Sequence, residues 1–385
     1  MVSRLGDPRI DAVEAWAFVV PNEDGPQSDG TYEWTSTTAV VVELTAGDAR
    51  GLGYTYTHLA ALPLIADHLA PALLGLEPLA RGAAHEAMLA ACRNLGRPGL
   101  ALMAVSACDA ALWDLAGRLL GRPLADLLGR VRDEVPVYGS GGFCSFDLGR
   151  LRRQLVGWVQ EGIGRVKLKI GREPARDLPR VAAAREAVGP GVGLMIDANG
   201  ALERKAALAL AQDLRGLGVD WFEEPVSSDD LEGLRLLRDR GPPGLEVAAG
   251  EYGWDLAYFR RMLEAGAVDV LQPDATRCGG PTGFLQAVAL ARAFGAPCST
   301  HTAPTLHAHL AAACAPVRHL EYFSDHVRVE GLLFDGAARA RRGRVRIDPT
   351  RPGLGIELRR ADAARLCAAH ARRGRSRVGA GGTRT

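Results

Sequence analysis

Seven ionisable residues in the middle of this 385-residue chain each end a short apolar run, and they recur at nearly even spacing. Successive gaps between them are 28, 26, 28, 23, 27 and 20 residues, about the length of a strand, a helix and two loops. In a (β/α)8 barrel the carboxyl ends of the strands meet at one mouth, where active sites lie. The spacing therefore predicts one site built from residues far apart in sequence. The seven residues are Lys169, Asp197, Glu223, Glu251, Asp274, His301 and Glu321.

The chain from Val135 onward alternates short apolar segments with helical stretches, for example 177–188, 205–217 and 282–294. Strands alternating with helices favour a parallel α/β sheet, and eight strand candidates favour closure into a barrel. We therefore expect an α/β barrel domain over residues 131–335 that carries the active site. The predicted strands are 135–138, 165–170, 193–197, 219–223, 246–250, 268–272, 296–300 and 318–322.

Residues 1–130 are expected to form a separate α+β domain. Segments 15–20 and 37–44 are strand candidates, and the clearest helical pattern spans 104–120. Between the two strands, residues 21–34 are rich in Asp, Glu, Asn, Gly and Ser, which predicts a long polar loop. Loops of that length inside a compact domain are often lids or binding loops.

The C-terminal part of the chain is expected to leave the barrel. Residues 336–360 contain short extended pieces that we expect to return to the N-terminal domain. Residues 361–385 begin as a possible helix and then become rich in Arg, Gly and Ala. That composition is typical of a disordered, solvated basic tail.

The composition excludes several classes of function. With 46 basic and 45 acidic residues, nothing favours nucleic acid or an anionic membrane as a partner. The seven cysteines are scattered and never form CxxC, so neither a disulfide framework nor a zinc site is expected. The polar N-terminus lacks the apolar core of a signal peptide, and no uncharged apolar stretch reaches about 18 residues. We therefore expect a cytoplasmic protein.

Three of the seven residues are carboxylates that end successive strands, Asp197, Glu223 and Glu251. Carboxylates that converge on one mouth repel one another unless a cation neutralises them. Oxygen ligands favour a hard ion, so we expect Mg²⁺, with Mn²⁺ as the alternative. Any one of these acids alone is more often a helix cap or a surface charge, but that reading does not suit three acids in register.

Lys167 and Lys169 lie on one face of the strand Val-Lys-Leu-Lys-Ile, because side chains alternate along a strand. Lysines that face a barrel interior are costly without partners, and a neighbouring cation lowers a lysine pKa enough for it to act as a base. The alternative is an edge strand with solvated lysines.

His301 and Asp274 are one strand unit apart, so the aspartate can bind one imidazole nitrogen and fix the tautomer of the ring. Alone, His301 would more often be a structural histidine.

Two other patterns do not carry chemistry. His307 and His309 are two residues apart on a helix and do not face each other, so we interpret them as non-ligands. The glycine-rich segment 189–193 precedes a strand, whereas a dinucleotide-binding loop follows one.

Together these residues resemble the enolase superfamily, in its mandelate racemase-like branch (the mandelate racemase/muconate lactonizing enzyme family). The resemblance covers nearly the whole chain, and it is specific because several short motifs occur in order. It implies a (β/α)7β-type modified TIM barrel with an N-terminal α+β capping domain. The motifs are Val166-Lys167-Leu168-Lys169, Asp197-Ala198-Asn199, Glu223-Glu224-Pro225, Gly250-Glu251, Pro273-Asp274-Ala275, Gly279-Gly280, Ser299-Thr300-His301, Leu320-Glu321 and the helical segment 110–117.

The resemblance also implies a role for each site residue. Asp197, Glu223 and Glu251 would bind Mg²⁺. Lys169 would act as a base on one face of the substrate α-carbon and the His301–Asp274 dyad on the other. The remaining roles are carboxylate neutralisation by Lys167, a substrate hydroxyl contact by Asn199 and a hydrogen bond from Glu321 to the developing enolate.

The expected reaction begins with removal of the proton α to a carboxylate. We favour an acid-sugar dehydratase that gives a 2-keto-3-deoxy acid, because the loop 21–34 and the later Tyr54, Tyr56 and His58 are polar. The alternatives are a racemase or epimerase of a 2-hydroxy acid and, more remotely, a non-catalytic scaffold. The expected partner is a small carboxylate substrate, and the resemblance implies a homo-oligomer.

Overall fold

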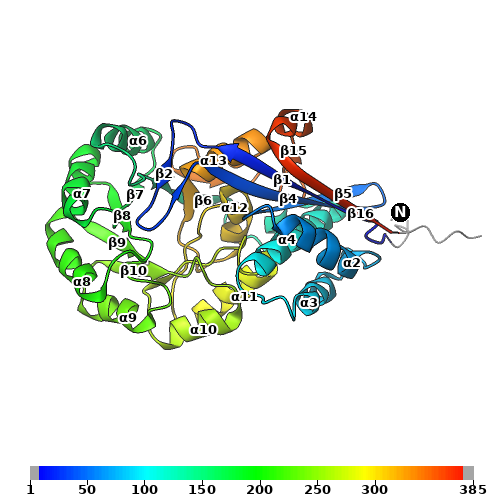
Figure 1. Ribbon diagram of the computed structural model, residues 1–385, viewed down its shortest axis with the longest axis horizontal. Helices are drawn as coiled ribbons and strands as arrows, with labels where there is room; N and C mark the ends of the chain where they lie inside the picture. The colour runs from blue at the N-terminus through cyan, green and yellow to red at the C-terminus, as the bar shows by residue number, and fades with distance from the viewer. Residues whose placement is uncertain (1–7, 376–385) are drawn as a thin grey trace, which may run out of the picture.

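The computed structural model describes residues 8–375, which form a barrel and a capping domain packed against it (Figure 1). The sheet of the barrel has the strand order β11-β10-β9-β8-β7-β6-β12, and neighbouring strands are parallel. Cys298 closes the ring, because it bridges in parallel to Leu271 on one side and to Val317 on the other. The predicted barrel is confirmed, with the expected strand at 296–300 reduced to this bridge. The strands are β6 (Glu134–Gly141), β7 (Arg165–Lys169), β8 (Gly193–Asp197), β9 (Val219–Glu223), β10 (Glu246–Ala249), β11 (Val270–Leu271) and β12 (Leu320–Phe323).

Helices follow the strands and cover the outside of the barrel, as Figure 1 shows for α6 to α10. Asp147, Asp230 and Asp255 begin three of these helices, each accepting a hydrogen bond from the backbone N–H three residues later. Such caps satisfy N–H groups that the first helical turn leaves unpaired. The helices are α6 (Leu148–Gln160), α7 (Pro174–Val188), α8 (Arg204–Asp213), α9 (Leu231–Arg240), α10 (Leu256–Glu264), α11 (Gly280–Ala293), α12 (Pro304–Ala313) and α13 (Ser324–Leu333).

Strand alternation decides which side chains face the interior of the barrel. Lys167 is paired with Met195 in the register of β7 and β8, and Met195 belongs to the small apolar cluster inside the ring. Leu168 is paired with Ile196, and both pack in the main core between the sheet and the helices. Lys167 and Lys169 therefore point inward, as the sequence predicts.

The capping domain is an antiparallel sheet of order β16-β1-β4-β5 with helices on one face. Strand β5 lies directly on α4, because a Cβ at Gly53 would come within 2.1 Å of the carbonyl oxygen of Ala107. The strands are β1 (Ala12–Pro21), β4 (Ser36–Ala46), β5 (Ala49–Tyr56) and β16 (Cys367–Gly374), and the helices are α1 (Ala61–Leu64), α2 (Ala70–Leu73), with the π-helical turn Ile65–Leu69 between them, α3 (Arg81–Ala91), α4 (Leu100–Leu120) and α5 (Leu124–Leu127).

Helix α4 is the one helix within residues 8–375 that is long and apolar enough to cross a membrane. In this fold, 83% of its most apolar window is buried, against the sheet of the capping domain and against α11. Its hydropathy therefore reflects a position in the protein core.

The expectation of a disordered tail from residue 361 is wrong for the part that the structure describes. After α14 (Arg360–Ala363), β16 pairs antiparallel with β1 along its length. The His370 ring stacks on Trp16 at 5.3 Å and its Nε2 atom lies 2.8 Å from Glu14 Oε1. An edge strand that is exposed on one face tolerates a basic, alanine-rich composition. Composition alone therefore does not distinguish this strand from a disordered tail. Residues 376–385 lie outside the described residues.

The segment 336–360 contacts both domains. Strand β14 (Arg344–Arg346) pairs with β6 of the barrel, and β15 (Glu357–Leu358) pairs with β13 (Phe334–Asp335). On the other side, the backbone N–H of Leu354 donates to Asp114 of α4 over 2.5 Å.

The polar loop 21–34 lies over the mouth of the barrel and contains a short hairpin of β2 (Gln27–Ser28) and β3 (Glu33–Trp34). A Cβ at Gly30 would come within 2.3 Å of the carbonyl oxygen of Ala198, which follows β8. Glycine at this position therefore lets the tip of the loop contact the rim of the barrel.

Candidate active site

The three predicted carboxylates converge at the carboxyl ends of β8, β9 and β10. Asp197, Glu223 and Glu251 each offer an oxygen, and these oxygens lie within 4.8 Å of one another. All three side chains are buried, with Asp197 and Glu223 fully inaccessible to solvent. Three acids in so small a volume would repel strongly if all were ionised without a compensating charge.

The donor set fits a hard divalent cation. The ligands are oxygens only, and the Glu251 Oε2 atom is buried without a hydrogen bond. Asn199 and Glu224, which follow two of the ligand strands, each have a further buried oxygen without a hydrogen-bond partner. Carboxylate oxygens with room for water or substrate are the environment that Mg²⁺ takes in proteins.

The two lysines of β7 supply positive charge in the structure as it stands. The Lys167 Nζ atom lies 2.6 Å from Glu223 Oε1, 2.8 Å from Glu321 Oε1 and 3.6 Å from Asp197 Oδ2. Lys169 donates to Asp197 Oδ2. Burial lowers the pKa of both lysines, but the facing carboxylates outweigh it and hold both pKa values above the ordinary lysine value.

In the strand order of the barrel, the triad strands β8, β9 and β10 lie between β7, which carries the lysines, and the segment that ends at His301. Its Nδ1 atom is 2.8 Å from Asp274 Oδ2, and its Nε2 atom is 3.3 Å from Glu251 Oε2. Asp274 Oδ1 accepts from both the N–H and the hydroxyl of Thr276. Its two oxygens are thus held by different partners, which fixes the carboxylate plane against the imidazole.

Glu321 and Asn199 also lie at the mouth, where the sequence places them. Glu321 Oε2 accepts from the backbone N–H of Thr302 over 2.7 Å, and its other oxygen faces Lys167. Burial raises the pKa of Glu321, but Lys167 outweighs it and brings the pKa below its usual range. Asn199 has a φ of 47°, and its backbone N–H donates to Asp197 Oδ1.

Two residues at the mouth were missed by sequence reasoning. The Arg277 Nη1 atom lies 3.3 Å from Glu251 Oε1, and its Nε atom lies 3.6 Å from Asp274 Oδ2, so the guanidinium links a triad carboxylate to the dyad. The sequence feature that could have indicated Arg277 is its position three residues after Asp274, in the turn that follows β11. Glu224 has a φ of 39° and is 1% exposed; burial, then the charge of Glu251, raises its pKa well above the usual value.

A cavity of about 450 Å³ opens above these groups, between the barrel and the capping domain. The capping domain lines it with polar and aromatic side chains, including Thr31, Tyr32, Tyr56 and His58. Two of the polar residues predicted for the substrate site do not line this cavity: Asn22 of the loop donates to Trp34 O, and Tyr54 donates to Glu330. The cavity is nevertheless lined by hydroxyl-bearing residues, such as Thr31, Ser36 and Thr57, as well as by the predicted bases Lys169 and His301.

His307 and His309 bind the backbone at both ring nitrogens. His307 accepts from Ala275 N and lies 2.8 Å from Thr302 O, and His309 contacts Ala125 N and Leu354 O. Neither contributes to the triad.

Both domains match models of the same protein family. Residues 19–129 match the model of the mandelate racemase / muconate lactonizing enzyme N-terminal domain, and residues 150–363 match the enolase C-terminal domain-like model. The chain is 34% identical to the L-talarate/galactarate dehydratase of Salmonella typhimurium over 84% of this chain and 81% of that protein. It is 35% identical to the D-galactarolactone cycloisomerase of Agrobacterium fabrum over 75% of this chain and 80% of that protein.

Solved structures agree with these relatives. A mandelate racemase/muconate lactonizing enzyme-like protein from Rubrobacter xylanophilus superposes with a TM-score of 0.91, at 52% identity, covering 94% of this chain and all of that one. The Salmonella dehydratase with bound Mg and L-lyxarohydroxamate superposes with a TM-score of 0.88, at 31% identity, covering 97% of each chain. The chain therefore belongs to the enolase superfamily, in the mandelate racemase/muconate lactonizing enzyme family.

Proposed function

We propose that this protein is a Mg²⁺-dependent acid-sugar dehydratase. The observation that carries the proposal is the placement of two proton-transfer groups, Lys169 and the His301–Asp274 dyad, around one carboxylate triad under a hydroxyl-lined cavity. A base removes the proton α to the substrate carboxylate, and the hydroxyl on the β-carbon then leaves as water after accepting a proton. The resulting enol tautomerises to a 2-keto-3-deoxy acid.

In this proposal Asp197, Glu223 and Glu251 hold the cation, with Mn²⁺ as an alternative to Mg²⁺. When bound, the ion supplies Lewis-acid stabilisation of the negative charge that develops on the substrate carboxylate. Lys167 is fully buried at the foot of the triad and adds a fixed positive charge on the same side. Such preorganised charge is usually the largest contribution to lowering a barrier of this kind.

Lys169 is the proposed base on one face of the substrate. As long as Lys169 is paired with Asp197, its pKa is held above the ordinary value and the amine stays protonated. If Asp197 serves as a metal ligand, its carboxylate would no longer be free to pair with Lys169, and the charge of Lys167 on the same strand face would then act to lower the pKa of Lys169. Lys169 would thereby be suited to act as a base.

His301 is the proposed acid for the leaving hydroxyl. Asp274 binds the Nδ1 side of the ring, which leaves Nε2 facing the triad and the cavity. Asn199, with a buried and unpaired amide oxygen, is placed to accept a hydrogen bond from a substrate hydroxyl. Glu321 is the proposed partner of the enolate oxygen, a role that requires its carboxyl to take up a proton.

A second candidate is racemisation or epimerisation of a 2-hydroxy acid. It draws on the same two groups, because proton removal on one face and return on the other inverts the α-carbon. The named relatives favour dehydration, since the Salmonella protein is a dehydratase of acid sugars. The Agrobacterium relative, a cycloisomerase, adds lactones to the compounds worth testing.

The test is a panel of aldonic acids, aldaric acids and their lactones, incubated with Mg²⁺ in deuterated water. We expect a 2-keto acid from at least one member, with loss of activity in Lys169→Ala and in His301→Asn. Lys205→Ala is a matched control, because Lys205 is exposed on α8. Deuterium at the α-carbon with inversion and no keto product would select the racemase. No product and no exchange with any member would refute both.

We also propose that the enzyme works in the cytoplasm as a homo-oligomer, without nucleic acid or membrane as a partner. The seven free cysteines support a reducing compartment, and the net charge of +1 gives no electrostatic attraction to polyanions as a whole. Gel filtration with light scattering measures the oligomeric state directly.

A further inference from the structure

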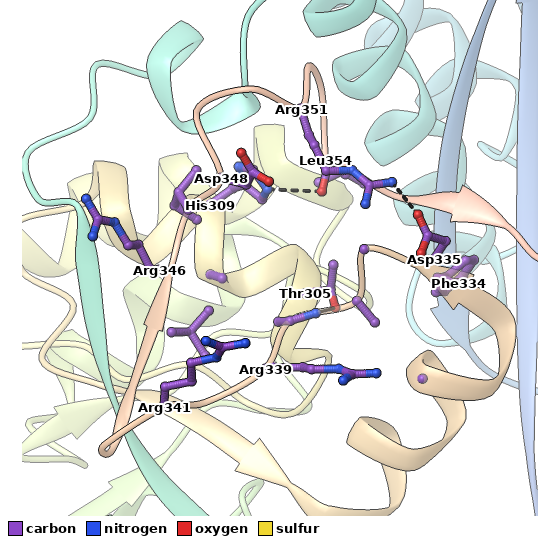
Figure 2. Close-up of a pocket in the computed structure, with 18 of the residues that line it drawn as sticks. Thr305, His309, Phe334, Asp335, Arg339, Arg341, Arg346, Asp348, Arg351 and Leu354 are labelled. Atoms are coloured by element: carbon purple, nitrogen blue, oxygen red, sulfur yellow. Dashed lines mark hydrogen bonds and ion pairs between the residues drawn. The ribbon is translucent and has the colours of Figure 1, made fainter.

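A second cavity, of about 830 Å³, lies beside α12, between that helix and the C-terminal segment 334–359 (Figure 2). None of the described residues that line it also lines the catalytic cavity. Its volume falls within the range of about 300–1,000 Å³ that is typical of small-molecule sites. The proposed function does not use this cavity.

The walls of this cavity carry a local excess of positive charge. Six lining residues are arginines and three are acids, whereas the whole chain has a net charge of only +1. Asp335 is already engaged, because it lies 2.8 Å from Arg351 and 3.8 Å from Arg359. The other four arginines make no side-chain hydrogen bond or ion pair with any residue between 8 and 375. These four, Arg339, Arg341, Arg344 and Arg346, are called the arginine pocket below.

The backbone fixes the positions from which these exposed arginine side chains extend. Arg341 and Arg344 exchange backbone hydrogen bonds of 2.7 and 3.1 Å, which closes a tight turn. In β14, Val345 pairs with Val135 of β6 and is buried in the core. Side chains alternate along a strand, so Arg344 and Arg346 both face away from the core, and both line the cavity.

We propose that the arginine pocket binds a small polyanion, an organic phosphate or a polycarboxylate, at a site separate from the catalytic cavity. The planar guanidinium fork matches the oxygens of phosphate and carboxylate, and such charge-assisted hydrogen bonds are about twice as strong as neutral ones. Four like charges on one hairpin repel one another, and a bound anion removes that repulsion. The proposal goes beyond the proposed catalytic function and does not depend on it.

Isothermal titration calorimetry on the full-length protein tests the proposal, with inorganic pyrophosphate in one arm and citrate in the other. Mg²⁺ is left out of the buffer, because both probes bind Mg²⁺ and the heat of that reaction would mask binding to the protein. Ionic strength is matched with KCl. We expect saturable binding of at least one probe, weakened by about 10-fold or more in Arg341→Gln/Arg344→Gln, because two charge-assisted contacts are lost. Arg93→Gln/Arg97→Gln is the matched control: both arginines are exposed and belong to the capping domain, and we expect unchanged affinity. The stronger probe distinguishes phosphate from carboxylate chemistry.

Equal weakening in the two double variants, or no saturable heat, would overturn the proposal. Binding that survives Arg341→Gln/Arg344→Gln would locate the anion elsewhere, for example at the lysines of the catalytic site, and would also overturn it. A change of oligomeric state in that variant without loss of anion binding would identify the face as an interface between copies instead. If the double variant does not fold, Arg341→Gln and Arg344→Gln are measured singly. None of these measurements requires turnover, so failure here is distinguishable from failure of the proposed function.

Discussion

The Nδ1 atom of His301 lies 2.8 Å from Oδ2 of Asp274, across the gap between two neighbouring strand positions of the barrel. Burial raises the pKa of Asp274, but the hydrogen bond and the charge of His301 outweigh it and hold the pKa below its usual range. The aspartate therefore stays ionised and favours the tautomer with a proton on Nδ1. In the proposed reaction, Nε2 is then the atom that exchanges a proton with the substrate.

Asp274→Asn tests this arrangement. The amide cannot stabilise a charged imidazole, and it favours the wrong tautomer, so we expect kcat for the 2-keto product to fall by about 10²–10⁴-fold. Mg²⁺ affinity, measured by calorimetry, should change little, because Asp274 is not part of the triad. A variant with wild-type kcat would rule out a catalytic role for the dyad.

Removal of the metal tests the triad. Chelation should abolish activity and lower the free energy of unfolding, because only the folded state brings the three carboxylates together to bind the ion. Mg²⁺ at about 100 times its Kd should restore about 2.7 kcal/mol of that stability. Glu223→Gln should weaken Mg²⁺ binding in calorimetry, with Glu203→Gln, an exposed glutamate before α8, as the control. Full activity in chelator would refute a metal-dependent reaction.

The local part of this site was predictable from the sequence. The observed bounds of β8 and β9 are those expected, 193–197 and 219–223, because each is a short apolar run closed by an acid. Strand alternation and the common mouth of a parallel barrel then bring Lys169, Asp197 and Glu223 together without further information.

Non-local features were not predictable in the same way. Strand β5 contains Gly51 and Gly53, which weaken a strand pattern but are required here because α4 packs directly on them. Strand β16 exists through pairing with β1, more than 300 residues earlier in the chain. The link from Arg277 to Glu251 likewise depends on how two loops meet at the mouth.

Arg277→Met tests whether this arginine positions the dyad. Burial lowers the pKa of Arg277, but Glu251 and Asp274 outweigh it and raise the pKa above the usual value, so the side chain is a permanent cation between them. Its loss should lower kcat by about 10- to 100-fold, with Arg277→Lys recovering part of the activity. The Kd for Mg²⁺ should not rise, because removal of a nearby cation does not disfavour a second one. A rise in that Kd with unchanged kcat would contradict a positioning role.

Glu330 predicts a pH-dependent stability at the contact between the capping domain and the barrel. It is 1% exposed and accepts hydrogen bonds from Tyr54 over 2.7 Å and from the Thr305 backbone N–H over 3.0 Å. Burial raises its pKa to about 7 from the ordinary glutamate value of 4.5, although the hydrogen bonds lower it in part. The folded state therefore binds more protons than the unfolded state between pH 4.5 and 7, so its stability falls as pH rises through that window.

Glu330→Gln should remove this pH dependence, because the amide does not titrate. Relative to wild type, the variant should gain up to about 3 kcal/mol of unfolding free energy between pH 5 and pH 8, from a pKa difference of about 2.5 units. At pH 5 it should be the less stable protein, since its amide group loses part of the acceptor capacity that Tyr54 and Thr305 use. Urea unfolding at several pH values, with exposed Glu203→Gln as control, measures the difference. Parallel pH profiles for wild type and Glu330→Gln would show that Glu330 has the same pKa in both states and would refute the prediction.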